Sequence, residues 1–360
     1  MYLAGKFIAD AEHHSLTRYL GELIGNISPS SVVLPWWDHA QELTLNSGHK
    51  IPVIGLGTWQ SKPGEVQQAV EDAIDLGYRH FDCALAYENE GEIGQAIAKK
   101  IQEGVVTRQE LFVTTKLPPV LIEPTLVREG FNTSLKRLGL DYVDLYLLHN
   151  AISINRDYIK TLPPGSVLKR PEDPSKFFRN VDHVAVWHEL EKLVDEGLVR
   201  SIGVSNFNQQ QLQRLIDHGR IKPAVLQVEC HAYFPQHDLL AFCQRHHVVL
   251  EAYSPLGSPQ RWGGNASGPV LLEDQVLTDI AKKHGRTPAQ ILLRSLVERG
   301  VVVLPKSVNK VRLQQNLQIW DFHLDDDDKH KMEHMGKNGK RLIDYATWVD
   351  SPNYPFQALL

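Results

Sequence analysis

The feature that most constrains the fold is the alternation, from Tyr78 onward, of short apolar, β-branched segments with longer amphipathic ones. This alternation is typical of repeated βα units that build a parallel sheet. The short segments are almost continuously apolar, as strands must be when helices cover one face and a barrel interior covers the other. Eight such units predict a closed (β/α)8 TIM barrel. The predicted strands are residues 80–83, 111–117, 143–149, 201–207, 225–232, 248–256, 301–306 and 317–322.

The segment before the barrel predicts a β-hairpin. Residues 42–45 and 51–56 flank the turn Asn46-Ser47-Gly48, and the pair is placed to close the bottom of the barrel. Residues 1–41 fit neither the hairpin nor the barrel, and we expect this N-terminal extension to be poorly ordered. Residues 42–360 then form the (β/α)8 barrel, including a C-terminal tail at the substrate pocket. Long intervals after the strands ending at His149 and Leu256 supply further walls of that pocket.

Composition and charge exclude several classes of function. The formal net charge is −5 and no basic stripe is present, which argues against nucleic acid as a partner. The three cysteines lack the spacing of a metal or redox pair, and we expect a reducing compartment. No apolar run approaches the ~20 residues needed to span a bilayer, and no targeting signal is evident. We therefore expect a cytoplasmic monomer that acts on a small molecule and does not bind a membrane.

Four polar residues lie at or just after the ends of neighbouring predicted strands. Asp82, Lys116 and His149 end the first three strands, and Tyr87 follows the first. Because neighbouring strands of such a barrel end at one face, we expect the four side chains to converge. An ammonium group beside a tyrosine favours the phenolate, so Lys116 would lower the pKa of Tyr87 toward the working pH. Asp82 would keep Lys116 charged, and His149 would orient a carbonyl oxygen.

Each of these residues, taken singly, also has a structural explanation. Asp82 would serve equally as a helix cap, Lys116 as an exposed charge at a strand end, and His149 as a satisfied core histidine. Four such residues at one barrel edge favour chemistry: delivery of a proton to a carbonyl group that receives a hydride.

Several motifs make the sequence similar to the aldo-keto reductases, of the aldose and aldehyde reductase type, from residue 43 onward. They are Gly55-Leu56-Gly57-Thr58-Trp59, Phe81-Asp82-Cys83-Ala84 and Tyr87-Glu88-Asn89-Glu90. The spacing of Asp82, Tyr87, Lys116 and His149 matches the catalytic tetrad of that family. The resemblance implies that Tyr87 is the general acid, that Lys116 and Asp82 assist it, and that His149 positions the substrate carbonyl.

The resemblance also implies an NADPH/NADP+ site of the barrel type, and no G-x-G-x-x-G follows a predicted strand. Ser205, Asn206 and Gln227 would bind the nicotinamide carboxamide, and Tyr253 would stack on its ring. A loop after Tyr253 would cover the pyrophosphate, with residues 261–268 as a mobile lid. Two cations near one phosphate favour NADPH over NADH. The remaining cofactor positions are Gly57, Thr58, Ser254, Leu256, Ser258, Lys306, Ser307, Val308, Arg312, Gln315 and Asn316.

The predicted substrate pocket departs from the family pattern. Asn150 stands where tryptophan is common, Pro118 replaces a frequent aromatic residue, and residues 151–179 look extended. The aromatic walls that remain are Trp59 and, from the tail, Tyr345 or Trp348. We expect a more open or more polar pocket, with His149, Asn150 and Trp59 touching the substrate.

These observations predict an NADP-dependent oxidoreductase that reduces an aldehyde or ketone to the alcohol. The alternative is a catalytically weak NADPH-binding barrel that acts as a sensor or structural partner. Hydrolase chemistry has little support, because the sequence has neither a metal-spaced histidine cluster nor a nucleophile elbow, and we predict no metal site.

Overall fold

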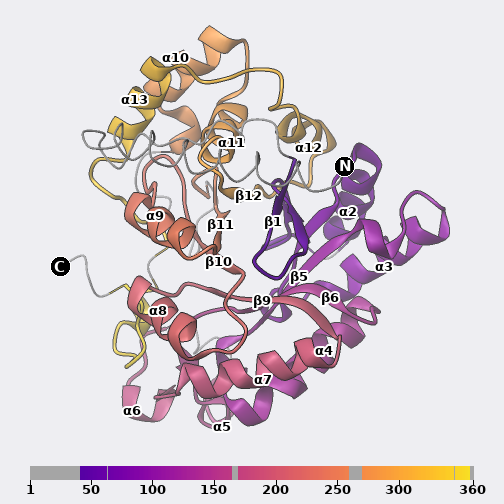
Figure 1. The fold of residues 1–360 in the computed structure, drawn as a ribbon, viewed down its shortest axis with the longest axis vertical. Helices are drawn as coiled ribbons and strands as arrows, with labels where there is room; N and C mark the ends of the chain where they lie inside the picture. The colour runs from indigo at the N-terminus through magenta and orange to yellow at the C-terminus, as the bar shows by residue number, and fades with distance from the viewer. Residues whose placement is uncertain (1–40, 63, 164–168, 259–269, 344, 357–360) are drawn as a thin grey trace, which may run out of the picture. The chain divides into compact units, whose positions relative to one another are not determined.

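The computed structural model describes residues 41–62, 64–163, 169–258, 270–343 and 345–356. Within them, eight parallel strands pair side by side and helices lie outside the strands (Figure 1). The predicted (β/α)8 barrel is confirmed. In spatial order the strands are β12 (Val302–Leu304), β11 (Val249–Tyr253), β10 (Val225–Glu229), β9 (Val199–Ser205), β6 (Val143–Leu148), β5 (Phe112–Leu117), β4 (His80–Asp82) and β3 (Leu56–Gly57).

Backbone hydrogen bonds between the segment that leads into β3 and the segment that contains β12 close the barrel. Val303 N donates to Val53 O at 2.8 Å, and Gly55 N donates to Val303 O at 2.9 Å. Gly57 N continues the ladder to Pro305 O at 3.1 Å. A Cβ atom on Gly55 would lie 2.6 Å from a side-chain carbon of Leu304, so only glycine permits this close approach.

Seven of the eight predicted strands are present, and the eighth is wrong. Residues 317–322 hold the end of helix α12 (Lys310–Leu317) and an irregular segment, not a strand. Ile319 in this segment is buried, and its carbonyl oxygen accepts a hydrogen bond from Arg294 in helix α11 (Pro288–Val297). The apolar residues Ile319 and Phe322 therefore join the hydrophobic core without forming a strand. The first strand of the barrel is instead β3, which lies at the end of the predicted hairpin: its two residues, Leu56 and Gly57, are too few to carry a strand pattern.

The predicted hairpin is present and lies at the bottom of the barrel. Strands β1 (Glu42–Thr44) and β2 (Lys50–Pro52) pair in antiparallel fashion. Asn46 Nδ2 donates to Pro223 O at 2.8 Å, just before β10, and Ser47 Oγ lies 2.7 Å from Ser201 Oγ near the start of β9. Figure 1 shows the hairpin in indigo across the strands.

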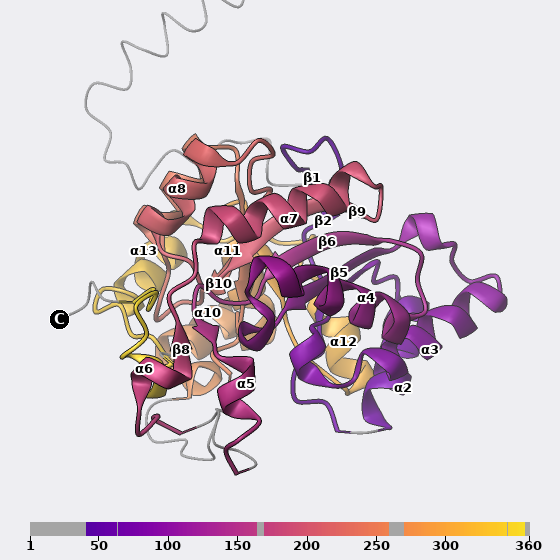
Figure 2. The same ribbon diagram turned by 90° about the horizontal axis from the view of Figure 1, so that it is seen from below.

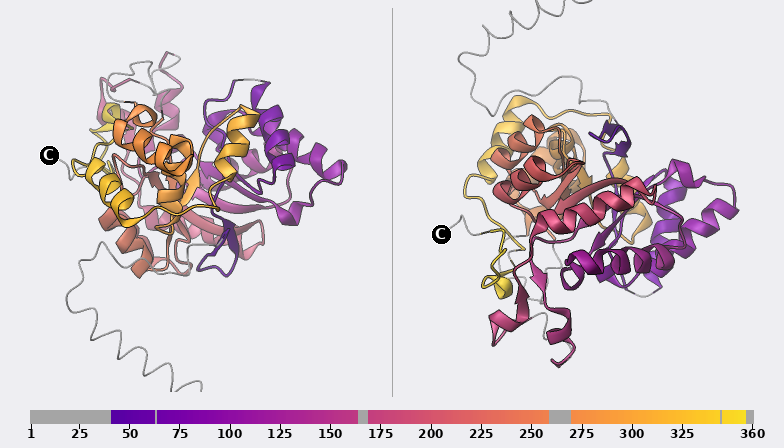
Figure 3. Two further views of the ribbon diagram at one scale, coloured as in Figure 1. Left: turned by 90° about the horizontal axis from the view of Figure 1, so that it is seen from above. Right: turned by 60° about the horizontal axis from the view of Figure 1, so that its bottom comes forward.

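Helices connect the strands and cover the barrel from outside (Figures 2 and 3). Gly77 ends α2 (Glu65–Leu76) with φ 105°, a left-handed conformation that favours glycine. Asp325 caps the N-terminus of α13 (Asp326–Met335), so the acidic residues 325–328 lie at the positive end of that helix. Further helices are α3 (Glu90–Gln102), α4 (Val127–Leu138), α7 (His183–Asp195), α8 (Gln209–His218), α9 (His237–Arg245) and α10 (Gln275–His284).

The long segment after β6 and the C-terminal tail pack against each other. The segment carries β7 (Ser153–Ile154) paired with β8 (Phe178–Arg179), and the short helices α5 (Arg156–Ile159) and α6 (Pro174–Phe177). Trp348 of the tail, in the 3₁₀ turn η9 (Ala346–Trp348), joins a small apolar cluster with Phe177. Arg170 donates two hydrogen bonds of 2.9 Å to Asp350. Figures 2 and 3 show the two segments side by side.

Two predictions fall outside the described residues. The order of the N-terminal extension, residues 1–41, concerns a segment of which only residue 41 is described, and the lid at 261–268 lies within 259–269. Among the described helices, none has the length and apolar character that crossing a membrane requires.

Candidate active site

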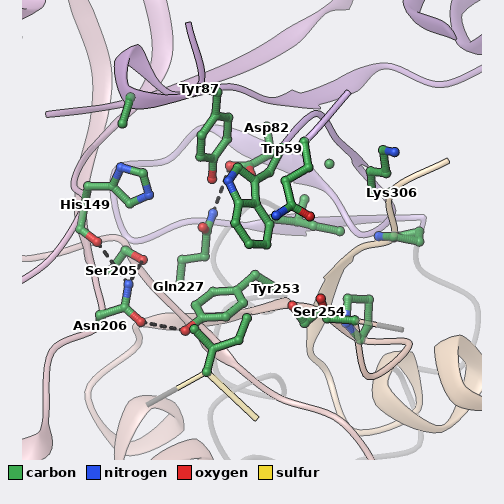
Figure 4. A pocket seen from close by; sticks show the side chains of 18 of the residues that line it. Trp59, Asp82, Tyr87, His149, Ser205, Asn206, Gln227, Tyr253, Ser254 and Lys306 are labelled. Carbon is green, nitrogen blue, oxygen red and sulfur yellow. Dashed lines mark hydrogen bonds between the residues drawn. The ribbon is translucent and has the colours of Figure 1, made fainter. Parts of the chain in front are cut away.

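A cavity of about 1360 Å³ opens at the C-terminal ends of the barrel strands (Figure 4). This is the face where barrels of this type place their ligand-contacting residues, because the loops that follow the strands all leave there. Its volume exceeds the ~300–1,000 Å³ of a pocket for one drug-sized molecule. Three of the four predicted tetrad residues, Asp82, Tyr87 and His149, lie in its wall.

Lys116 lies beneath the wall and joins two of these residues. Its side chain is fully buried, and Nζ lies 2.7 Å from Asp82 Oδ1. The same Nζ donates to Tyr87 Oη at 3.1 Å and to Cys83 O at 3.0 Å. The ammonium group thus has three oxygen partners, as a buried charge requires.

Burial and charge shift the pKa values of this pair. Burial alone would lower the pKa of Lys116, but Asp82 and Tyr87 outweigh it and hold the pKa above its ordinary value. Burial raises the pKa of Tyr87, and the opposing effect of Lys116 is smaller. This differs from the expected net lowering, because desolvation and the nearby carboxylate of Asp82 exceed the attraction of one cation. The phenol is therefore a firmly protonated hydrogen-bond donor at neutral pH.

His149 packs edge-on against the ring of Tyr87, with the ring centroids 5.5 Å apart. Burial and the charge of Lys116 lower the pKa of His149 well below its ordinary value, so the imidazole is neutral. Its Nδ1 is buried and has no hydrogen-bond partner among the described residues. A neutral imidazole at a cavity wall can donate one N–H to an oxygen atom.

A hydrogen-bonded chain of polar groups borders the cavity beside His149. Asn206 Nδ2 donates to His149 O at 3.0 Å and to Ser205 Oγ at 3.1 Å, and Tyr253 Oη donates to Asn206 Oδ1 at 2.8 Å (Figure 4). Asn206 has φ 57° and Ser254 has φ 50°, in the left-handed region. Non-glycine residues in this region cluster at functional sites, where surrounding structure holds the strain.

The opposite end of the cavity carries cations. Lys306 is half-buried and Arg312 is exposed, and neither forms an ion pair with any residue that the structure describes. Burial lowers the pKa of Lys306; the charge of Glu65 opposes this effect, and that of Arg312 adds to it. Two cations that repel each other at a cavity rim favour an anion between them. The predicted cofactor residues that line the cavity are Gly57, Ser205, Asn206, Gln227, Tyr253, Ser254, Leu256, Ser258, Lys306, Ser307, Val308, Arg312, Gln315 and Asn316.

Thr58 is the one predicted cofactor residue that does not line the cavity. It is buried, and its Oγ1 donates to the main-chain oxygen of Asp82 at 2.8 Å. Its carbonyl oxygen accepts from Asn89 at 2.9 Å. Thr58 therefore braces the strand end that presents Asp82.

The predicted substrate residues Trp59 and Asn150 both line the cavity, as does Pro118. Asn150 is buried, and its Oδ1 accepts a hydrogen bond from Ile152 N at 3.0 Å, which fixes the side chain. Tyr345 and Trp348 of the tail also line the cavity, and their rings stack 5.3 Å apart.

Sequence reasoning missed the anchor of the tail. Glu229, at the end of β10, is fully buried and accepts hydrogen bonds from Leu342 N at 2.7 Å and Ile343 N at 3.0 Å. Arg341 lies between two aromatic rings, 3.7 Å from the centre of Phe356. An acidic residue at the end of an apolar strand was the available signal.

It also missed Glu251, a carboxyl group buried in the middle of β11. Glu251 is hydrogen-bonded to Gln227, and through Gln227 it is connected to Asp82. A charged residue type at an interior position of a strand was the signal here.

Comparison with known proteins finds relatives that agree with one another in family. The model of the Aldo/keto reductase family matches residues 53–337. Prostaglandin F synthase 1 of Bos taurus is 43% identical over 324 residues, which cover 88% of this chain and 98% of that protein. Aldo-keto reductase family 1 member A1 of Gallus gallus is 41% identical over 323 residues, with 87% and 97% covered. The solved structure of the aldose reductase from Schistosoma japonicum has a TM-score of 0.79 and 40% identity, and covers 89% of this chain and 100% of its own.

Proposed function

Since the chain belongs to the aldo/keto reductase family, we propose that it reduces an aldehyde or ketone to the alcohol, with NADPH as cofactor and Tyr87 as general acid. Membership of the family implies an oxidoreductase that acts on carbonyl compounds. The observation that carries the finer proposal is the position of Lys116 Nζ, 2.7 Å from Asp82 and 3.1 Å from Tyr87 Oη at the wall of a large cavity.

The residues of the cavity fit NADPH. Amide and hydroxyl groups of Ser205, Asn206 and Gln227 border the deep end, where a carboxamide finds donors and acceptors. Lys306 and Arg312 border the other end and form no ion pair with the described residues, which suits a phosphate group. When bound, NADPH supplies the hydride.

The protein's own groups supply the proton and orient the carbonyl oxygen. Tyr87 keeps its proton at neutral pH because burial raises its pKa, and its Oη faces the cavity. As negative charge develops on the substrate oxygen, the phenol can give up this proton because Lys116 stabilises the phenolate left behind. Neutral His149 donates an N–H to the same oxygen and fixes its direction.

The test compares two tyrosine variants of the full chain. Oxidation of NADPH in the presence of a nitrobenzaldehyde is followed by absorbance for the wild type, Tyr87→Phe and Tyr142→Phe. We expect Tyr87→Phe to lose about 10²–10⁴-fold in kcat, the usual contribution of a general acid. Tyr142→Phe is the matched control, because it removes a phenol hydroxyl at the start of β6, at the opposite end of the barrel.

Equal rates for Tyr87→Phe and the wild type would remove the assignment of the general acid. A wild type that binds NADPH but fails to oxidise it when any aldehyde or ketone is added would favour the sensor or structural-partner function. That alternative leaves the buried contact between Lys116 and Tyr87 without a purpose, and for this reason we favour catalysis.

A further inference from the structure

A second carboxyl group lies inside the barrel, next to the tetrad. Glu251 in β11 is fully buried, with apolar residues on both sides of it in the strand. Its Oε2 accepts from Gln227 Nε2 at 2.6 Å, and its Oε1 lies 3.4 Å from His80 Nε2. A carboxyl group in such a place is costly unless each oxygen has a partner or the group keeps its proton.

The contacts of Gln227 fix the orientation of its side chain. Its Nε2 donates to Asp82 Oδ1 at 2.9 Å and to Glu251 Oε2 at 2.6 Å (Figure 4 shows the contact with Asp82). These two contacts use both hydrogens of the carboxamide, and a flipped amide would place its oxygen against two carboxyl oxygens. Gln227 lines the cavity, and its Oε1 is therefore the side-chain atom that can still accept a hydrogen bond from a ligand.

The contacts of His80 indicate that Glu251 carries a proton. His80 Nδ1 lies 3.0 Å from Pro52 O, and a carbonyl oxygen only accepts, so Nδ1 carries the hydrogen. Nε2 of the neutral ring then holds a lone pair, which faces Glu251 Oε1 and Thr114 Oγ1, each at 3.4 Å. Oε1 has no hydrogen-bond partner of its own among the described residues. A proton on Oε1 directed at Nε2 satisfies both groups.

The surrounding charges favour the same arrangement. The charged or titratable groups that face Glu251 are His80 of β4, Asp82 at the end of β4 and Lys116 of β5. Lys116 already pairs with Asp82, so an ionised Glu251 would be a second, uncompensated negative charge. Burial raises the pKa of Glu251 and Asp82 adds to this, whereas burial lowers the pKa of His80 to about 4.

We propose that Glu251 is a positioning residue that keeps its proton at neutral pH: it donates to His80, accepts from Gln227, and holds Gln227 Oε1 toward the nicotinamide carboxamide. This inference rests on the proposed NADPH site. Glu251, which lies outside the cavity wall, thereby determines which atom of Gln227 contacts the cofactor.

Two substitutions separate a neutral carboxyl group from an ionised one. Glu251→Gln has the shape and hydrogen-bonding pattern of the protonated acid, because its NH₂ donates to His80 and its oxygen accepts from Gln227. Glu251→Ala leaves Gln227 Nε2 with one partner. NADPH affinity of the full chain is measured by quenching of protein fluorescence, first at pH 7. We expect Glu251→Gln to bind within about twofold of the wild type and Glu251→Ala about tenfold more weakly, the effect of one lost hydrogen bond.

The pH dependence of affinity gives the second readout. Ionisation of Glu251 in the wild type would remove the donor to His80 and add charge beside Asp82, so the wild type should bind NADPH more weakly at pH 9 than at pH 7. Glu251→Gln has no proton to lose here and should keep its affinity. An affinity loss in Glu251→Gln at pH 7 as large as that in Glu251→Ala would overturn the proposal.

Unfolding without nucleotide gives a readout independent of the cofactor. A carboxyl group whose pKa is raised on folding stabilises the native state fully below its unfolded pKa, and this contribution is lost as pH rises through the folded pKa. Between pH 4.5 and pH 8 the wild type should therefore lose stability relative to Glu251→Gln. A wild type that is more stable than Glu251→Gln at pH 7 would indicate an ion pair with protonated His80 and would also overturn the proposal.

The two readouts distinguish this inference from the proposed function. If the wild type binds NADPH but reduces no carbonyl compound, the proposed function fails while the affinity and unfolding comparisons still decide the role of Glu251. If Glu251→Gln loses as much NADPH affinity as Glu251→Ala while the wild type reduces aldehydes, only the positioning role of Glu251 fails.

Discussion

The deep end of the cavity, around Lys116, and its outer end, around Lys306 and Arg312, hold their charges in opposite ways. Lys116 is fully buried and has three oxygen partners. Lys306 is half-buried, Arg312 is exposed, and neither has an ion-pair partner in the part of the chain that the structure describes.

This difference follows from the cost of desolvating charge. A buried cation without partners would unfold the site, so the deep end must be complete before any ligand enters. An exposed cation retains water and costs little to leave unpaired, so the outer end can reserve its charge for an anion. Variants of the deep end should therefore change folding and turnover together, whereas variants of the outer end should change affinity alone.

The largest effect is expected from Lys116→Met. The change leaves Asp82 buried without its cation, and removing one partner of a buried ion pair costs about 3–5 kcal/mol. It also removes the cation that stabilises the Tyr87 phenolate, so kcat should fall at least about 100-fold. Denaturant unfolding and steady-state kinetics measure the two losses.

Lys310→Ala is the matched control for Lys116→Met. Lys310 pairs with Asp72 at 2.9 Å on the surface, where such pairs contribute about 0–1 kcal/mol. A stability loss for Lys116→Met no larger than that for Lys310→Ala would show that the two ends do not differ as described.

The double variant Lys306→Ala and Arg312→Ala should have an intermediate effect, confined to binding. A hydrogen bond to a charged group contributes about 1.5–3 kcal/mol, so the Kd for NADPH should rise about 10–100-fold or more. The Kd for NADH should change little, because NADH lacks the additional phosphate. Titration of protein fluorescence with each nucleotide measures both constants. An equal loss of affinity for NADPH and NADH would show that the additional phosphate of NADPH does not bind at Lys306 and Arg312.

Ionic strength should have the smallest effect and should also separate the two ends. Salt screens exposed charges and leaves buried pairs nearly unaffected. Raising the salt concentration should weaken NADPH binding a few-fold more than NADH binding, while kcat at saturating NADPH stays constant. A kcat that falls with salt as steeply as affinity does would mean that the deep end is accessible to solvent ions.

The sequence predicted the barrel because seven strands carry a clear apolar pattern, and it failed where other forces decide. β3 is two residues long and is defined by its parallel pairing with Phe81 and Asp82 of β4, which local sequence does not reveal. Residues 317–322 contain apolar side chains that the core buries, Ile319 and Phe322 among them, so their composition resembles that of a strand. Tertiary packing outweighs local propensity in both cases.

The site could be predicted where its residues end strands, because strand ends of a barrel meet at one face. Thr58 does not line the cavity, because its side chain is hydrogen-bonded to the main chain of Asp82, a contact between segments that local sequence does not reveal. The direction of the pKa shift of Tyr87 could not be predicted, because it depends on how far burial exceeds the attraction of Lys116. Glu251 was missed because its partners come from other strands.

The most direct test of the contrast between the two ends is a single-turnover measurement of carbonyl reduction at saturating NADPH. It compares Tyr87→Phe with the double variant Lys306→Ala and Arg312→Ala in the same full-length protein. The account predicts a rate for Tyr87→Phe lower by about 10²–10⁴-fold, and a rate for the double variant close to that of the wild type once its weaker binding is saturated. A double variant as slow as Tyr87→Phe, or a Tyr87→Phe enzyme as fast as the wild type, would contradict it.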